Sequence, residues 1–146
     1  MLDHLEPASI IIKSAAVSDY YISEMSKQKL KKTATRLSLE LDPTPDILAE
    51  VGQRKGDRLL IGFAAETQNL AEEARRKLLS KKCDMVVANL VGDGLGFEAD
   101  TNEVDMITRA GQTVHAGPAS KREIAQKILD QIVSLRLSVR TADTLA

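Results

Sequence analysis

The most informative part of the chain is the segment Ile10-Ile11-Ile12-Lys13-Ser14-Ala15-Ala16-Val17-Ser18-Asp19-Tyr20. Its three isoleucines form a short β-branched run, which is typical of a buried strand. The strand ends in small residues and one carboxylate, Asp19. Ligands of α/β proteins bind at the carboxyl ends of strands, where small side chains let a ligand lie against the main chain. A tight turn with Asp19 as an N-cap is the alternative interpretation.

Strand and helix patterns alternate along the rest of the chain. Buried strands are predicted over 9–14, 58–64 and 84–89, a strand with one solvated face over 36–41, and a hairpin from 102–108 and 113–115 around Ala110-Gly111. Helices are predicted from Thr44-Pro45 to Arg54, from Thr67 to Lys81, and from the capping box Ser120-Lys121-Arg122-Glu123 to Leu137. The buried helix positions are Leu70, Ala74, Leu78, Ile124, Ile128 and Ile132.

This order predicts an α/β fold, a three-layer α/β/α Rossmann-like sandwich with a mostly parallel sheet and the 36–41 strand projecting as a flap. The crossover rule places the loops after Ser14, Ala64 and Ala88 at one edge of the sheet, where we expect a site. The folded part is predicted to span 1–137, and 138–146 to form a disordered tail. The usual opening strand with its glycine-rich turn has no counterpart, so we expect the chain to begin partway through a larger domain.

Composition excludes several classes of function. The 146 residues are 43% hydrophobic and 28% charged, with a formal net charge of −1, so no overall field recruits nucleic acid or an anionic membrane. Aromatic residues make up 3% and Trp is absent, which argues against a base-stacking surface. The single cysteine, Cys83, allows no internal disulfide and is expected to be buried. We expect a cytoplasmic protein, because neither a membrane span nor a signal peptide is apparent.

The sequence gives little indication of a metal site or of a dinucleotide-binding site. His4 and His115 stand apart from any cluster, and no His/Cys/Asp spacing suggests zinc. The loop Gly92-Asp93-Gly94-Leu95-Gly96-Phe97 lacks the spacing of a phosphate-binding fingerprint. An NAD(P)-dependent oxidoreductase is disfavoured, since Tyr20 and Tyr21 are not followed by Lys four residues later.

Three further segments carry a resemblance to a known family. They are Lys29-Leu30-Lys31-Lys32, Asp42-Pro43-Thr44-Pro45-Asp46-Ile47-Leu48 and Gly62-Phe63-Ala64-Ala65-Glu66-Thr67. Together with 15–20, in this order and spacing, they resemble the phosphopantothenoylcysteine synthetase family of coenzyme A biosynthesis, over about 10–132. In many bacteria that enzyme is the C-terminal domain of a bifunctional flavoprotein, so FMN is expected only if a decarboxylase domain is fused upstream.

The resemblance implies a CTP site. Lys13, Ser14 and Ala15 would line the nucleotide, and Asp19 would approach its ribose or an associated Mg²⁺. Lys29 would meet the phosphates and act in catalysis. The base would lie on the turn of Pro45, Asp46, Ile47 and Leu48, and the triphosphate beside Phe63, Lys77 and Lys81. Judged from the residues alone, Lys77 and Lys81 are better explained as a solvated basic helix end.

The implied reaction is the CTP-dependent ligation of 4′-phosphopantothenate to cysteine through an acyl-cytidylate, carried out by a homodimer. The family's upstream Asn and glycine-rich loop have no counterpart in this sequence. A nucleotide-binding or assembly fragment without complete catalytic activity is therefore the alternative. A ligase assay with CTP, phosphopantothenate and cysteine distinguishes the two.

Overall fold

The computed structural model describes residues 1–23, 38–91 and 100–144, with side chains up to Ser138. The chain divides into a main unit, Met1–Ser14 with Leu48–Ala146, and a second unit, Ala15–Ile47. The segment between the first strand and the first helix is therefore a structural unit of its own, which the sequence did not indicate.

A five-stranded sheet forms the centre of the main unit. Its strands, in spatial order, are β1 (Ile10–Lys13), β4 (Leu59–Glu66), β5 (Met85–Leu90), β6 (Thr101–Thr108) and β7 (Thr113–Ser120). The first three pair in parallel, β6 runs antiparallel to β5, and β7 antiparallel to β6, so only β6 opposes the common direction. The predicted mostly parallel sheet is confirmed. The predicted hairpin joins β6 to β7, and Gly111 in its turn has φ +87°.

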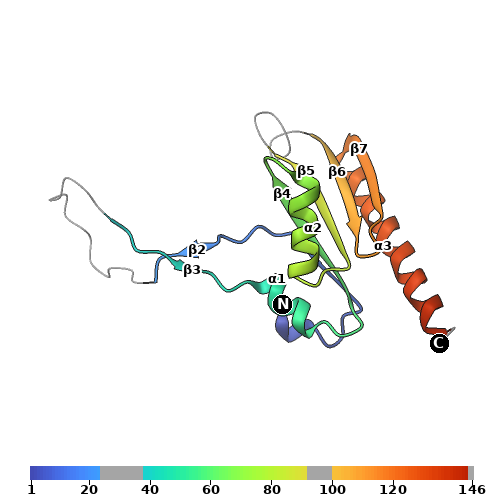
Figure 1. Cartoon of the computed structure of the whole chain (residues 1–146), viewed down its shortest axis with the longest axis horizontal. Coiled ribbons are helices and arrows are strands. Elements are labelled where there is room, and N and C mark those ends of the chain that lie inside the picture. Colours follow the sequence, from blue (N-terminus) through green and yellow to red (C-terminus); the bar gives the residue numbers. More distant parts are fainter. Residues whose placement is uncertain (24–37, 92–99, 145–146) are drawn as a thin grey trace. The chain divides into compact units, whose positions relative to one another are not determined.

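Helices cover both faces of this sheet. They are α1 (Ile47–Arg54), α2 (Leu70–Ser80) and α3 (Lys121–Thr144), after a short 3-10 turn η1 (Leu2–His4). Alternate residues of β4 point to opposite faces. Leu59 and Ile61 pack with the buried isoleucines of α3, whereas Gly62 lies against Leu48 of α1. Figure 1 shows α2 crossing in front of β4 and β5, and α3 running along β6 and β7. The predicted three-layer Rossmann-like sandwich is thus confirmed.

Details of α3 and its surroundings confirm local predictions made from the sequence. The N–H of Glu123 donates to Ser120 Oγ at 3.3 Å, and the N–H of Ser120 donates to Glu123 Oε2 at 3.0 Å, which is the predicted capping box. The hydroxyl of Ser120 also donates to Glu123 Oε2, at 2.7 Å, and this bond, together with the one from the Ser120 N–H, holds the pKa of Glu123 below its ordinary value. Ile124, Ile128 and Ile132 are buried as expected.

Several predicted boundaries are wrong, among them the start of α2, which lies at Leu70 rather than Thr67, and the end of β7, which lies at Ser120 rather than His115. α3 continues to Thr144 rather than ending near Leu137, so 138–144 are helical and not a disordered tail. No Gly or Pro interrupts that stretch, and nothing else in it stops a helix. α1 begins at Ile47, two residues after Pro45. No helix in the described part of the chain combines the length and the hydropathy of a membrane span.

The second unit contains a short antiparallel ribbon. Its strands are β2 (Tyr20–Tyr21) and β3 (Asp42–Pro43). The predicted 36–41 strand is not found over 38–41, and its first two residues lie outside the described residues. Alternation stabilises a strand only where one face is buried, and here Leu39 and Leu41 are 59% and 52% exposed.

Candidate functional site

The carboxyl ends of three parallel strands lie at one edge of the main sheet. β1, β4 and β5 are neighbours and end at Lys13, Glu66 and Leu90. The N–H of Val91 donates to the carbonyl of Glu66 at 3.0 Å, so the exits of β4 and β5 stay together. The predicted placement of these strand ends at one edge is confirmed, and this edge is the candidate site.

Four of the candidate residues lie around the centre of β4. In the sheet register Lys13 of β1 is the partner of Gly62, the residue before Phe63. Leu48 contacts the same position from α1. Lys77 Nζ of α2 donates to the carbonyl of Phe63 at 3.0 Å. Elements far apart in the sequence thus bring Lys13, Leu48, Phe63 and Lys77 together, and Gly62 is the central residue that sequence reasoning did not single out.

Lys77 is not the freely solvated lysine that the sequence alone favoured. Its side chain is partly buried, and its ammonium contacts a main-chain carbonyl rather than only water. An ammonium has three donors, so two remain for other acceptors. The ring of Phe63 lies on the other face of the sheet, where it packs against the hydrophobic cluster that contains the buried isoleucines of α3. On the face covered by α2, Phe63 therefore offers only its main chain to Lys77.

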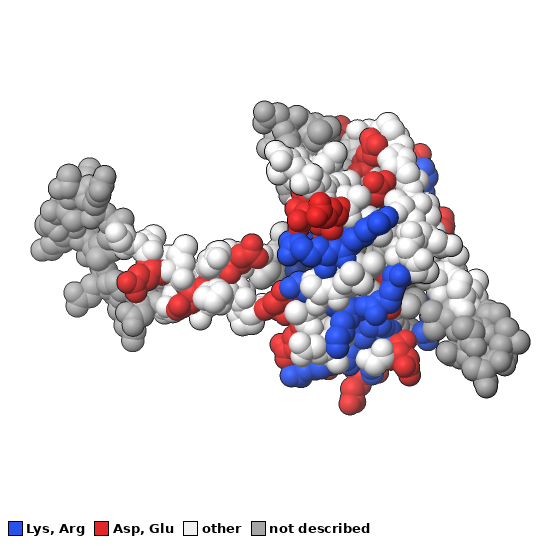
Figure 2. Space-filling view, viewed as in Figure 1, with Lys and Arg blue, Asp and Glu red and all other residues white. Residues whose placement is uncertain are grey.

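Lys81 follows Lys77 by one turn but lies just beyond the helix. It is the C-cap residue of α2, and its N–H donates to the carbonyl of Lys77 at 3.0 Å. Its own carbonyl lies against Gly52 of α1. Figure 2 shows basic side chains gathered over the face covered by α1 and α2, beside acidic side chains at the start of α2. α2 and its C-terminal turn supply Arg75, Arg76, Lys77, Lys81 and Lys82.

The second unit brings other candidates together. The N–H of Thr44 donates to the carbonyl of Asp19 at 2.8 Å, which places Asp19 next to the turn that continues with Pro45 and Asp46. The carboxylate of Asp19 is exposed, as are the side chains of Ala15, Pro45 and Asp46. Ser14, at the end of the main unit's first segment, is exposed as well, and Ile47 is half-buried. Lys29 lies outside the described residues.

Metal-binding clusters are not found in the described ranges. Among residues 1–23, 38–91 and 100–144, no three His, Cys, Asp or Glu side chains are arranged to hold an ion. Cys83 is fully buried, and burial raises the pKa of its thiol to about 11. The thiol is therefore protonated and packs as a small apolar group, as expected from the sequence.

His115 is not isolated, contrary to the expectation from its sequence position. The β6–β7 register brings it opposite Asp105, whose Oδ1 lies 2.9 Å from His115 Nδ1, while Glu103 Oε1 lies 3.3 Å from Nε2. The hydrogen bond to Asp105 is the main cause that raises the pKa of His115 above its ordinary value. Cross-strand pairing follows from register, which spacing along the sequence does not reveal.

The His115 pair predicts a pH dependence of stability. A raised pKa in the folded state makes the contribution complete below the ordinary value of 6.5 and lost as the pH rises through the folded-state pKa. The difference in melting temperature between the natural chain and His115→Gln should therefore shrink between about pH 5.5 and about pH 8.5. A difference that is constant across this range would contradict the pairing, and Gln126→Ala on the exposed surface of α3 serves as the pH-independent control.

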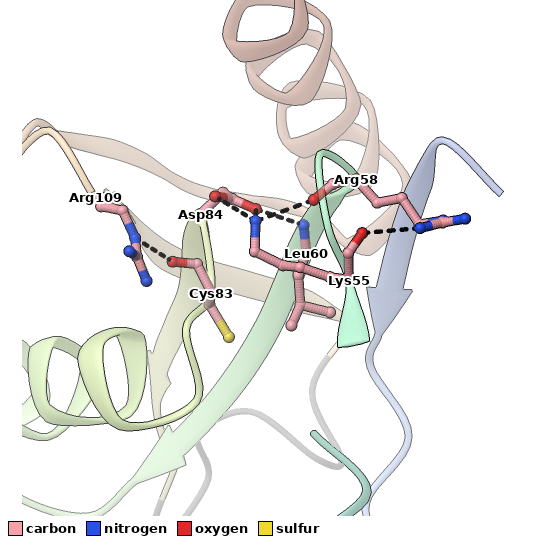
Figure 3. Close-up of polar contacts among 6 residues, drawn as sticks. All are labelled: Lys55, Arg58, Leu60, Cys83, Asp84 and Arg109. Carbon is pink, nitrogen blue, oxygen red and sulfur yellow. Dashed lines mark hydrogen bonds and ion pairs between the residues drawn. The ribbon is translucent and has the colours of Figure 1, made fainter. Parts of the chain in front are cut away.

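A polar cluster at the opposite, amino edge of the sheet fixes the starts of the strands. Lys55 Nζ donates to both carboxylate oxygens of Asp84, at 3.0 and 2.8 Å, and Asp84 Oδ2 also accepts the N–H of Leu60 at 2.8 Å (Figure 3). Arg58 Nε donates to the carbonyls of Leu5 and Ala8. This edge is structural, and only the position of Lys55 and Asp84 beside the predicted strand starts could have suggested it.

Comparisons with known proteins agree on one family. The profile described as DNA/pantothenate metabolism flavoprotein C-terminal domain matches residues 1–135. The coenzyme A biosynthesis bifunctional protein CoaBC of Bacillus subtilis (strain 168) is 40% identical over 136 residues, which are 92% of this chain and 34% of that protein. The CoaBC protein of Haemophilus influenzae is 39% identical over 125 residues, 85% of this chain and 31% of that protein. The chain thus spans about a third of the length of these curated relatives.

Solved structures give the same result. The crystal structure of the C-terminal domain of CoaBC superposes with a TM-score of 0.75 at 35% identity, covering 94% of this chain and 59% of that one. The DNA/pantothenate metabolism flavoprotein from Streptococcus pneumoniae superposes with a TM-score of 0.70 at 26% identity, covering 91% and 66%.

Proposed function

Because the chain belongs to the family of the DNA/pantothenate metabolism flavoprotein C-terminal domain, we propose that it is the ligase part of a coenzyme A biosynthesis enzyme. In this proposal it joins 4′-phosphopantothenate to cysteine at the expense of CTP, and it does so as a homodimer. Its sequence identity of 40% and 39% to two CoaBC proteins, over most of its length, supports the assignment. The observation that carries it furthest is the convergence of Lys13, Leu48, Phe63 and Lys77 around Gly62, at residues that the family resemblance implies for CTP.

The chemistry of the proposed reaction has two steps. A carboxylate oxygen of phosphopantothenate forms a bond to the α-phosphorus of CTP, and the bond to the leaving pyrophosphate breaks. The amine of cysteine then attacks the acyl carbon, CMP leaves, and the amine loses a proton. The first step concentrates negative charge on the α-phosphate, so positioned cations are the main requirement.

Lys77 meets that requirement in this proposal. The carbonyl of Phe63 fixes the direction of its ammonium, so little side-chain freedom remains to be lost when a phosphate binds. Partial burial reduces screening by water and strengthens the attraction to a phosphate oxygen. Lys81, one turn later, and Lys29 would add positive charge on the triphosphate, and Lys29 would act in the chemical step.

In this proposal Asp19 of the second unit also holds a magnesium ion. Mg²⁺ is usually bound by one or two carboxylates together with the phosphates of the substrate. The exposed carboxylate of Asp19 is a donor of this kind. When bound, the ion would neutralise phosphate charge, while Asp19 would hold it beside the turn of Pro45 and Asp46.

A ligase assay tests the proposal. With CTP, 4′-phosphopantothenate and cysteine, the chain should release CMP and pyrophosphate and form phosphopantothenoylcysteine. CTP should also raise the melting temperature more than ATP does, because the Pro45–Leu48 turn is the proposed base-selecting element. Thermal stabilisation by CTP without product would favour the alternative of a nucleotide-binding or assembly module. Equal shifts with all nucleoside triphosphates would remove the claim of base selectivity.

Lys77→Gln is expected to weaken CTP binding about tenfold or more. A hydrogen bond to a charged group contributes about 1.5–3 kcal/mol, and Gln keeps a donor for Phe63 but carries no charge. The free energy of unfolding should change little, because Ala74 and Leu78 form the buried face of α2. Isothermal titration with CTP measures the affinity, and Lys82→Gln, at an exposed neighbouring lysine, is the matched control. Loss of folding in Lys77→Gln would show instead that this side chain is structural.

A further inference from the structure

Gly62 of β4 has no side chain at a point where the end of the Leu48 side chain, from α1, lies against the strand. A Cβ built at this position would lie 3.1 Å from Leu48 Cδ2 and 3.2 Å from Cys83 Sγ. Both distances are shorter than ordinary van der Waals contacts between carbon or sulfur atoms. The end of the Leu48 side chain therefore occupies the space that any other residue at position 62 would take.

The neighbouring residues show that this space is specific to position 62. On the same face of β4 the flanking residues are Leu60 and Ala64, both almost completely buried. Leu48 is itself only 7% exposed, so it cannot move outward without opening a gap in the core. The absence of a side chain at Gly62 thus leaves the room that the end of the Leu48 side chain occupies against the strand that carries Phe63.

We propose that Gly62 is a positioning residue for the nucleotide, acting through Leu48. It rests on the proposed function, in which Leu48 belongs to the base-binding turn and Phe63 and Lys77 to the triphosphate side. A methyl group at position 62 displaces Leu48 by a few tenths of an ångström, while the hydrogen bond from Lys77 to Phe63 stays in place. The two ends of the bound nucleotide then no longer match their partners simultaneously.

The size of the effect follows from the displacement. A misplacement of about 1 Å can cost on the order of 100-fold in reaction rate. By analogy we expect a few tenths of an ångström to weaken CTP binding about 3- to 10-fold. Cys83 provides an internal comparison, because its thiol is as close to position 62 as Leu48 is, yet it belongs to no proposed nucleotide contact. Removing the Cδ atoms of Leu48 or the thiol of Cys83 makes room for the methyl group. We expect only the change at Leu48 to restore nucleotide binding, because only Leu48 belongs to a proposed nucleotide contact.

The test measures CTP affinity by isothermal titration in the full chain, with melting curves for every variant. Gly62→Ala should bind CTP about 3- to 10-fold more weakly than the natural chain. In Gly62→Ala with Leu48→Val the affinity should return to within about twofold of Leu48→Val alone, because valine lacks the Cδ atoms. In Gly62→Ala with Cys83→Ala the affinity should stay low.

Each other result overturns the inference. Unchanged affinity in Gly62→Ala, or equal recovery through Cys83→Ala, would mean that position 62 matters only for packing. If Gly62→Ala does not fold, the two double variants decide: recovery of folding and CTP binding through Leu48→Val supports the inference, and recovery through Cys83→Ala contradicts it. Absence of CTP binding by the natural chain refutes the proposed function, and the inference with it, and is recognised from that arm alone.

Discussion

Asp84→Ala is expected to lower the free energy of unfolding by about 3 kcal/mol, the lower end of the cost of removing one partner of a buried ion pair, because this pair is partly buried. The side chains of Lys55 and Asp84 are only 16% and 19% exposed, so the ammonium of Lys55 would remain largely out of water without its counter-charge. The N–H of Leu60 would lose its acceptor as well. Urea unfolding followed by circular dichroism measures the change.

Two further variants make the Asp84 prediction specific. Asp84→Asn keeps an oxygen for the N–H of Leu60 but removes the charge, so the part of the loss that it reproduces belongs to the ion pair. Glu50→Ala breaks the exposed pair with Arg54, in which the side chains are 37% and 60% exposed, and should cost at most about 0.5 kcal/mol. A loss below about 1 kcal/mol in Asp84→Ala would refute a structural role for this edge.

Gly52→Ala is expected to destabilise the chain by about 3 kcal/mol or more, the upper part of the range for overpacking. In most helix interiors this exchange stabilises by up to about 1 kcal/mol, because alanine is the better helix former. Here the sign reverses, since a Cβ on Gly52 would lie 2.0 Å from the carbonyl oxygen of Lys81 and 2.9 Å from its carbonyl carbon. These are main-chain atoms and cannot rotate away, so α1 and the end of α2 must separate.

The control for Gly52 lies one residue further along α1. Gln53→Ala, at an exposed position of the same helix, should change stability by no more than about 0.5 kcal/mol. Both variants are compared by urea unfolding. If Gly52→Ala proved as stable as the natural chain, the close approach of α1 to Lys81 would be wrong. Because Lys81 is a proposed triphosphate ligand, a folded Gly52→Ala protein should also bind CTP more weakly.

Local patterns in the sequence predicted most of the main unit. The β-branched run Ile10-Ile11-Ile12, the 3.6-residue period of Ala74 and Leu78, and the capping box at Ser120 each depend on neighbours within one turn or one strand. Such signals predict which element forms, and the order of elements then predicts a parallel sheet with its exits at one edge. The end of α3 was predicted too early, at Leu137. The helix continues because 138–144 contain neither a helix breaker nor a capping residue that ends it.

The candidate site could be predicted only in part from the sequence. The resemblance of the segments around Asp19, Pro45 and Phe63 to a known family indicated which residues to examine. It did not reveal that the carbonyl of Phe63, rather than its ring, faces Lys77, or that Asp19 contacts Thr44 through the main chain. Hydrogen bonds between segments 14 or 25 residues apart depend on how elements pack, and no local pattern reports that.

Hydrophobic periodicity and strand order are properties of the chain alone, so the fold class and the edge of the sheet where chemistry is expected could be predicted from the sequence. The family followed separately, from the resemblance of particular segments. The contacts of Gly52, Gly62, Asp84 and His115 are visible only in the folded chain. The effect of replacing a glycine can be predicted only when the atoms around it are known, and the effect of replacing a charged residue only when its partner is known. These neighbours and partners come from elements that are far apart in the sequence. The close contacts at Gly62 and Lys77 therefore form only when α1 and α2 pack on β4.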